Sequence, residues 1–280
     1  MNPTQQASAA AKFRAMHQSG CFLLPNPWDI GTAIHLQRLG FEALATTSAG
    51  FAFSRGKHDG GVPLDEMLTH IREIVEAMPL PVNADFESGY ADEPEGIAEN
   101  VRLCIATGVA GLSIEDNTRR SDAPLYEKEL AVDRIRAARA AIDASETGVV
   151  LTGRCEAWLV GDPDPLHTAL NRLVGYAEAG ADCLYAPGVS KPDEIAQIVK
   201  TVAPKPINVL VSGFNHQLSF SQLAELGVRR ISVGSGLALA AWGTFLRAAQ
   251  DIKTNGTFGL LANNAASADL NELFGGKPLS

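Results

Sequence analysis

The sequence is poor in residues that bind soft metals or form covalent cross-links. Only four of its 280 residues are cysteines, and none belongs to a Cys-x-x-Cys pair. This spacing argues against a disulfide framework and a structural zinc site, and it is typical of reduced, buried thiols in a cytoplasmic protein. The four are Cys21, Cys104, Cys155 and Cys183.

Long apolar runs and basic clusters are also missing. No uninterrupted apolar stretch approaches the roughly 20 residues that span a bilayer. Residues 1–16 lack the basic head and apolar core of a secretory signal. The formal net charge is -9, which argues against nucleic acid as a partner because phosphate binding requires clustered Lys and Arg. We therefore expect no membrane and no nucleic-acid partner, whereas a small anion fits a site where a metal or local cations reverse the field.

Short β-branched apolar runs alternate with longer amphipathic stretches along the whole chain. Strands are predicted at residues 21–24, 43–47, 82–86, 111–115, 149–154, 183–186, 207–211 and 230–233. Helices are predicted at residues 28–39, 64–77, 94–107, 132–143, 165–179, 192–202, 221–226 and 237–251. Eight strand–helix units in strict alternation predict an α/β fold, a parallel (β/α)8 barrel of the TIM type.

Glycines and the absence of linkers support one barrel. Gly40, Gly108, Gly180 and Gly227 each stand between a helix end and a strand, where a left-handed residue is needed. The alternative, an open doubly wound sheet, normally carries a Gly-x-Gly-x-x-Gly after its first strand, which this sequence lacks. We expect one domain over residues 1–280. Its tail at 255–280 contains a further helix near 265–274 and packs on a neighbouring subunit or frays.

Carboxylates follow two neighbouring strands at the end where barrel enzymes carry their chemistry. Asp85 and Glu87 follow the third strand, and alternation predicts that they point to the same side. Glu115 ends the fourth strand. Converging carboxylates repel unless a cation or proton lies between them. An all-oxygen set without His or Cys favours Mg²⁺ or Mn²⁺ over Zn²⁺. The alternative is that these acids cap helices or pair with surface bases.

A cation and several small residues complete the predicted site. Arg154 and Glu156 follow the fifth strand on the same side, so that Glu156 can hold the guanidinium while it grips a substrate carboxylate. A structural ion pair at the barrel rim is the alternative. The small residues after the second strand include Thr47, which is assigned to substrate binding. The amides of Ala49 and Gly50 that follow are candidates to hold a developing enolate oxygen.

Two further positions, Asp59 and Asn208, are assigned to the site. Asp59 lies on a polar loop, Gly56-Lys57-His58-Asp59-Gly60-Gly61, and is a candidate for the outer shell of the metal, with Lys57 or His58 as mobile acid or base groups. Asn208 on the seventh strand is assigned to substrate binding. A phosphosugar enzyme is an alternative, because Ser212-Gly213 and Gly234-Ser235-Gly236 follow strands seven and eight, where barrels often bind phosphate.

Five motifs follow one another in the order of a known family: Asn26-Pro27-Trp28-Asp29, Thr47-Ser48-Ala49-Gly50, Asp85-Phe86-Glu87-Ser88-Gly89-Tyr90, Ile114-Glu115-Asp116 and Gly153-Arg154-Cys155-Glu156-Ala157. With these motifs, the sequence resembles the isocitrate lyase/phosphoenolpyruvate mutase superfamily from about residue 22 to residue 249. The resemblance implies a (β/α)8 barrel whose last helix is often exchanged between subunits of a dimer within a tetramer. It also implies Mg²⁺ binding and stabilisation of a pyruvate enolate.

The resemblance also assigns roles. Asp85 resembles the direct metal ligand, and Glu87 and Glu115 resemble ligands that act largely through water. Ser48, with the two amides after it, resembles the cradle for the enolate and carboxylate oxygens. Arg154 resembles the residue that binds the substrate carboxylate, and Asp59 resembles the acid in the outer shell of the metal. Glu87 departs from the Asp of well-studied members.

Two departures bear on the subfamily. The isocitrate and methylisocitrate lyases carry a catalytic Cys on the loop after the Glu-Asp pair, and here residues 117–124 contain none. The phosphonate enzymes carry a His after the sixth strand, where this chain has Ala186-Pro187-Gly188. The sequence therefore resembles the decarboxylase-like and uncharacterised branch.

We expect a Mg²⁺-dependent lyase that cleaves a carbon–carbon bond next to the carbonyl of a small 2-oxo acid, like an oxaloacetate decarboxylase. Arg119 or Arg120, on a loop that closes over the site, is expected to bind the leaving carboxylate. The alternatives are a lyase acting on a 2-hydroxy carboxylate with Tyr90 or His58 as base, phosphorus–carbon chemistry, and an idle barrel that binds a metabolite. A homodimer or homotetramer is expected.

Overall fold

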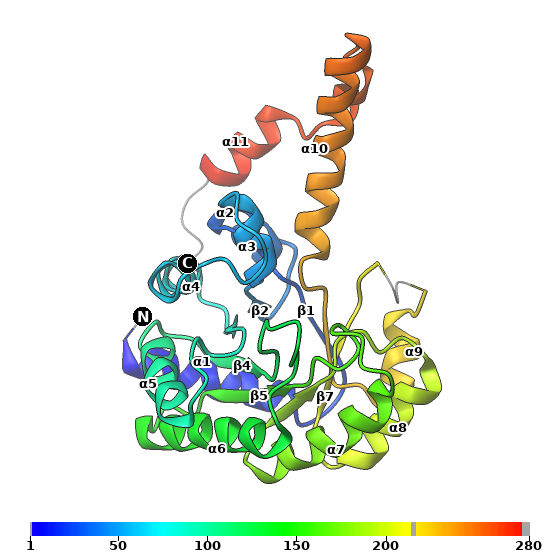
Figure 1. Ribbon diagram of the computed structural model, residues 1–280. Coiled ribbons are helices and arrows are strands. Elements are labelled where there is room, and N and C mark those ends of the chain that lie inside the picture. The colour runs from blue at the N-terminus through cyan, green and yellow to red at the C-terminus, as the bar shows by residue number, and fades with distance from the viewer. Residues whose placement is uncertain (1, 214–216, 276–280) are drawn as a thin grey trace.

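Eight parallel strands form a barrel in the computed structural model, which describes residues 2–213 and 217–275 (Figure 1). The strands pair in the order β1-β8-β7-β6-β5-β4-β3-β2. A hydrogen bond from the Ala45 amide to the Pro25 carbonyl (3.0 Å) closes the ring. The predicted fold is confirmed. The strands are β1 Phe22–Leu24, β2 Leu44–Ala45, β3 Val82–Asp85, β4 Gly111–Glu115, β5 Val150–Arg154, β6 Cys183–Tyr185, β7 Ile207–Leu210 and β8 Arg230–Ser232.

The helices between the strands begin at capping residues or prolines. The side chains of Asp29 and Ser219 accept a first-turn amide of α2 and α9, and a proline opens α5, α7 and α8. Helix α6 starts four residues before the predicted range. Its first residues, Lys128 and Glu129, are polar, so the apolar periodicity did not reveal this turn. The helices are α2 Ile30–Arg38, α4 Leu64–Glu76, α5 Pro94–Ile105, α6 Lys128–Ser145, α7 Pro165–Glu178, α8 Pro192–Val202, α9 Phe220–Glu225 and α10 Gly236–Asn255.

Helix α1 (Pro3–Met16) was not predicted from the sequence, and it closes the N-terminal end of the barrel. Its Phe13 is fully buried in a cluster with residues of β1, β2 and β5. The Gln6 amide nitrogen donates to the carbonyls of Ile105 (2.8 Å) and Val109 (3.0 Å). The segment is rich in Ala and Gln and has no broad apolar stripe, so periodicity does not reveal it. The position of α1 is explained by its packing against the N-terminal end of the barrel.

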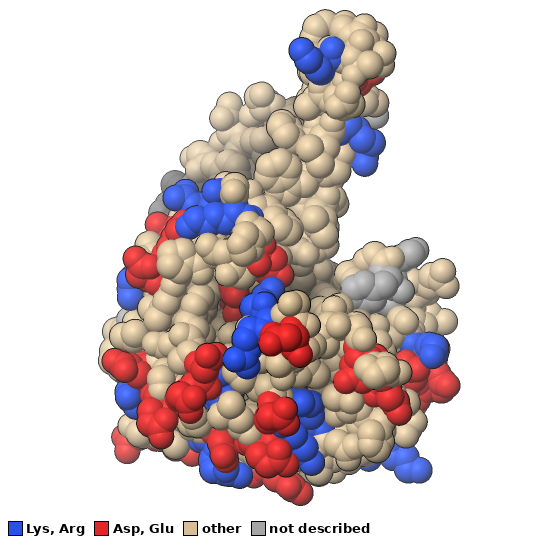
Figure 2. Space-filling model, viewed as in Figure 1, with Lys and Arg blue, Asp and Glu red and all other residues tan. Residues whose placement is uncertain are grey.

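Helix α10 projects away from the barrel, and α11 (Ser267–Gly275) turns back toward α2 (Figure 1). Helix α10 is followed by a 3₁₀ turn, Gly259–Asn263, and by α11, close to the helix predicted near 265–274. Residues 276–280 of the predicted tail lie outside the described residues. The projecting part carries few charges in Figure 2, in contrast to the barrel. Its exposed apolar side chains include Leu239, Phe245, Leu246, Phe258 and Phe274. Among the described residues, no helix is long and apolar enough to cross a membrane.

Candidate active site

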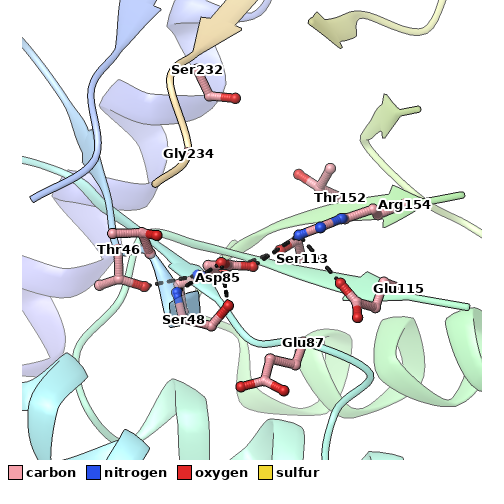
Figure 3. A network of polar contacts seen from close by, with 12 residues as sticks. Thr46, Ser48, Asp85, Glu87, Ser113, Glu115, Thr152, Arg154, Ser232 and Gly234 are labelled. Atoms are coloured by element: carbon pink, nitrogen blue, oxygen red, sulfur yellow. Dashed lines mark hydrogen bonds and ion pairs between the residues drawn. The ribbon is translucent and has the colours of Figure 1, made fainter. Parts of the chain in front are cut away.

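A cavity of about 660 Å³ opens at the C-terminal ends of the strands. Three neighbouring strands end in the charged residues that line or adjoin it, since β3 ends at Asp85, β4 at Glu115 and β5 at Arg154. Parallel pairing sets Glu115 beside Arg154 in register. The structure thus brings together the strand-end groups that the sequence placed far apart along the chain (Figure 3).

Asp85 is held by donors from two directions. Its Oδ2 accepts hydrogen bonds from the Ser48 amide (2.9 Å) and the Ser48 hydroxyl (2.8 Å). Its Oδ1 accepts from Nη1 of Arg154 (3.1 Å). Its own amide donates to Oγ1 of Thr46 (2.9 Å). Ser48 therefore orients the carboxylate of Asp85 in this structure.

Arg154 lies among three carboxylates. Its Nη1 is 3.1 Å from Oδ1 of Asp85 and 3.2 Å from Oε2 of Glu115. Its Nε is 2.5 Å from Oε1 of Glu156, and its guanidinium faces the ring of Tyr185 at 5.2 Å. The predicted Arg154–Glu156 contact is present. One guanidinium shared by three acids is held in a single orientation, which suits the planar, two-pronged recognition of a carboxylate.

Glu87 reaches the site by a different route from the one predicted. Strand β3 ends at Asp85, and Glu87 has a left-handed backbone (φ 49°), so strand alternation does not set its direction. The turn still leaves its side chain near Asp85, where the Tyr90 hydroxyl donates to Oε1 (3.0 Å). Burial, and then the negative charge of Asp85, raise the pKa of Glu87 to about 7. The Arg119 guanidinium, 3.5 Å from Oε2, opposes this rise in pKa without cancelling it.

Glu115 is almost fully buried, and its pKa is raised, mainly by burial, although the positive charge of Arg154 opposes the rise. Within the described chain, no three acid, His or Cys side chains are grouped closely enough to bind one ion together. Two arginine side chains lie between the acids instead: Arg154 and, from the loop after β4, Arg119.

The donor set suits a hard divalent cation that keeps part of its water shell. Mg²⁺ usually takes one or two carboxylates directly and reaches others through water, so it does not require Asp85, Glu87 and Glu115 to converge on one point. These three acids, with Asp59 and Glu156, face two arginines. The excess negative charge is consistent with a site that a divalent ion would complete.

The small residues after β2 form the first turn of a helix that the sequence did not predict, α3 (Ser48–Ser54). Thr47 caps it, and its Oγ1 accepts from the Gly50 amide (3.2 Å). The Ala49 amide has no acceptor within the described chain and lines the cavity. Of the two amides predicted to hold an enolate oxygen, the structure therefore leaves that of Ala49 available.

The polar loop before α4 contributes one acid to the cavity. Oδ2 of Asp59 is 3.4 Å from Nη1 of Arg119. Lys57 is paired with Glu66, outside the site. The exposed His58 contacts the carbonyl of Asp59 through Nδ1 (2.8 Å).

The wall formed by β7 and β8 is polar. The Asn208 side chain donates to Oγ of Ser232 (2.9 Å) and accepts from Nε of the buried Arg230 (2.9 Å). The amide of Gly234, where phosphate binding was an alternative, donates to Oδ1 of Asn26 (2.8 Å). This amide is engaged by the protein itself, which weakens the phosphosugar reading.

Asp116 is a supporting residue that the sequence analysis did not assign. It is buried, and it accepts from the Glu156 amide (2.8 Å), the Tyr176 hydroxyl (2.6 Å) and Arg172 (3.2 Å). It thus fixes the loop that carries Glu156. The adjacent Glu115-Asp116 pair was the available signal, because alternation sends the second acid behind the barrel wall.

Comparisons with known proteins agree with this geometry. A family model described as phosphoenolpyruvate phosphomutase matches residues 13–253. An uncharacterised protein of Mycobacterium tuberculosis is 34% identical over 80% of this chain and 81% of its own. A 2-methylisocitrate lyase of Salmonella typhimurium is 34% identical over 59% of each chain. The crystal structure of a candidate lyase/mutase from Burkholderia cenocepacia J2315 has a TM-score of 0.94 and 47% identity, and the match covers 98% of both chains.

The family model spans most of the chain, including every strand of the barrel and the charged residues at the ends of β3, β4 and β5. The chain therefore belongs to the phosphoenolpyruvate mutase/isocitrate lyase superfamily, whose members are mostly carbon–carbon lyases and mutases.

Proposed function

We propose that this protein is a Mg²⁺-dependent lyase that cleaves a carbon–carbon bond of a small 2-oxo acid, as in the decarboxylation of oxaloacetate. The bond that breaks joins the carbon beside the carbonyl (C3) to the leaving carboxylate (C4). The observation that carries the proposal is the convergence of Asp85, Glu115 and Arg154 at the mouth of the barrel. Acids in excess suit a divalent cation, and the guanidinium among them suits an organic anion.

Asp85 would hold the ion directly, and Glu87 and Glu115 would hold it largely through water. Mn²⁺ would serve in place of Mg²⁺. When bound, the ion supplies Lewis acidity toward the carboxylate and carbonyl oxygens of the substrate. Arg154 binds the substrate carboxylate, and Glu156 keeps the guanidinium in place from behind. The Ala49 amide donates to the oxygen that gains negative charge as the bond breaks, a contribution of about 3 kcal/mol if well aimed.

Bond cleavage in a 2-oxo acid of this kind needs no strong base. The leaving carboxylate departs as carbon dioxide, its electron pair passes toward the carbonyl, and the resulting pyruvate enolate takes up a proton. The two candidate bases are poorly suited to remove a proton. The Tyr90 hydroxyl donates to Glu87, and burial raises the pKa of Tyr90 well above its usual value. His58 is exposed and does not line the cavity.

A lyase acting on a 2-hydroxy carboxylate is the second candidate. It is favoured by the 34% identity to a 2-methylisocitrate lyase. The loop at residues 117–124 contains no cysteine, so this reaction would need another acid–base group. The two candidates differ in their products, because only the second releases an oxo acid from a hydroxy acid.

The test is a panel of 2-oxo acids and 2-hydroxy acids assayed with Mg²⁺ and with EDTA. We expect carbon dioxide and pyruvate from an oxaloacetate-like acid, with activity only in the presence of the metal. Asp85→Ala should be inactive while keeping its fold by circular dichroism. Turnover that persists in EDTA, or full activity in Asp85→Ala, would refute the proposal.

A second copy of the chain is the proposed partner of the projecting helices. The apolar side chains of α10 and α11 are exposed in one chain, and few charged residues lie on this part of the surface in Figure 2. A homodimer or homotetramer that exchanges α10, as the family resemblance implies, would cover them. Light scattering after size exclusion should give a dimer or tetramer mass, and a monomer mass would contradict this assembly.

A further inference from the structure

Arg119 occupies the centre of the acidic cluster. Its Nη2 is 3.3 Å from Oε1 of Glu115 and 3.5 Å from Oε2 of Glu87, and its Nη1 is 3.4 Å from Oδ2 of Asp59. The three acids come from β4, from the turn after β3 and from the loop before α4. One guanidinium therefore bridges three separate segments of the barrel mouth.

The local backbone is shaped to insert this side chain. Arg119 has a left-handed conformation (φ 62°), which is unfavourable for a residue with a side chain. Its amide donates to Oδ1 of Asn117 (2.8 Å), and Asn117 bridges to Leu125 at the base of the loop. Gly60 packs against the guanidinium so closely that an added Cβ would lie 3.2 Å from Cζ of Arg119. The strained backbone and the close glycine hold the cation over the acids.

The same acids are those assigned to the metal. A guanidinium beside Glu87 and Glu115 fills the space between them and carries a positive charge into it. A divalent ion using the same oxygens, directly or through water, would be repelled by that charge over a few ångströms.

We propose that Arg119 competes with the divalent cation for Glu87 and Glu115, so that binding of the metal displaces the Arg119 side chain toward the substrate cavity. The inference rests on the metal site of the proposed function. Arg119 already lines the cavity, so the displaced guanidinium remains at its rim, where an entering carboxylate gives it a new partner. Loading of the metal and binding of the acid are thereby coupled through one side chain.

The test is the affinity for Mn²⁺ alone, measured from the electron paramagnetic resonance signal of the free ion. Arg119→Ala should bind Mn²⁺ about tenfold more tightly than the wild type, because the competing cation is gone. The affinity of Arg119→Lys for Mn²⁺ should lie between those of the wild type and Arg119→Ala, because lysine keeps the charge. Arg120→Ala is the matched control: it removes the same charge from the same loop, and no ion pair of Arg120 is found in the described chain. Its affinity should stay within about twofold of the wild type.

A thermal-melting experiment supplies the second readout and checks the fold. In EDTA, Arg119→Ala should melt below the wild type, because Asp59, Glu87 and Glu115 lose the counter-charge that Arg119 supplies. With saturating Mn²⁺ the difference should vanish, since the ion has already displaced the arginine.

The possible outcomes distinguish a failure of the Arg119 competition from a failure of the proposed metal-dependent function. If Arg119→Ala binds Mn²⁺ no more tightly than the wild type and Asp85→Ala still abolishes binding, competition is wrong and the metal site stands. If neither the wild type nor any variant binds Mn²⁺, both proposals fall. A melting difference that is the same with and without Mn²⁺ also overturns the competition.

Discussion

The two ends of the barrel balance their charges in opposite ways. At the N-terminal end, Asp182 is shared by Arg14 (2.6 Å) and Arg139 (3.1 Å) and also accepts from the Leu151 amide (2.9 Å). One acid there has two cationic partners. At the C-terminal mouth, five acids share Arg154 and Arg119.

The pKa shifts follow this difference. Burial alone would raise the pKa of Asp182, but the hydrogen bond from Arg14 and the Leu151 amide bring it below its usual value. Burial and the charge of Asp85 raise the pKa of Glu87 to about 7 instead. At the N-terminal end the charge of Asp182 is thus compensated by its arginine partners, and this arrangement stabilises the fold. At the mouth the carboxylates still repel one another, and a bound cation would relieve that repulsion.

Backbone strain is distributed in the same way. Three of the four left-handed residues other than glycine in the described chain, Glu87, Tyr90 and Arg119, lie at the mouth, and the fourth ends helix α6. Unfavourable conformations of this kind persist where the surrounding structure enforces them, and they concentrate at functional sites.

Arg154→Lys should give the largest effect. Lysine keeps the charge but has no fork to reach three acids and a substrate carboxylate at once. We expect kcat/KM to fall about 10²- to 10³-fold with little change in Tm. Arg14→Lys at the opposite end is the matched control, and its kcat/KM should change less than about twofold. Equal losses in the two variants would remove the distinction between the ends.

Glu87→Gln tests how the acids at the mouth affect the pH dependence of the free energy of unfolding, measured in metal-free buffer. Because the folded-state pKa of Glu87 is about 7 and its ordinary value is 4.5, the folded chain keeps a proton that the unfolded chain loses. This group's contribution to stability is complete below about pH 4.5 and is lost as pH rises through 7, by about 3 kcal/mol. Urea unfolding at about pH 5 and about pH 8 should show a smaller decline in the variant. The same decline in variant and wild type would exclude Glu87 as its source.

Asp182→Asn should have the smallest effect, and the effect should be on stability alone. Losing the ion pairs to Arg14 and Arg139 should lower the free energy of unfolding by about 2 kcal/mol at neutral pH. Because the folded-state pKa of Asp182 is lowered, this contribution is present above its ordinary pKa of 3.8 and disappears as pH falls through the folded value. Asp143→Asn, which removes an exposed partner of Arg139, should cost less than about 0.5 kcal/mol. An Asp182→Asn variant with impaired catalysis would contradict the assignment of this end to stability.

The fold and the strand-end residues were predictable because they depend on local patterns. Alternating runs placed each strand within two residues of its observed bounds, and the carboxyl ends of parallel strands must meet at one face. The contribution of α1 was not predictable, since its burial depends on the barrel floor and not on an apolar stripe.

Three details of the site depended on tertiary structure. Glu87 is directed by a left-handed turn, where strand alternation no longer applies. The Gly50 amide is engaged by the Thr47 cap of a helix that the sequence did not reveal. Arg119 enters the acidic cluster through the fold of its loop, and no spacing in the sequence specifies that contact.

The most direct test of the account is a Mn²⁺ binding titration of the wild type, Asp85→Asn and Asp182→Asn. The account predicts a single saturable site per chain in the wild type, its loss in Asp85→Asn and its retention in Asp182→Asn. Equal binding by all three proteins, or no saturable binding by the wild type, would contradict the claim that the acids at the mouth gather a divalent ion.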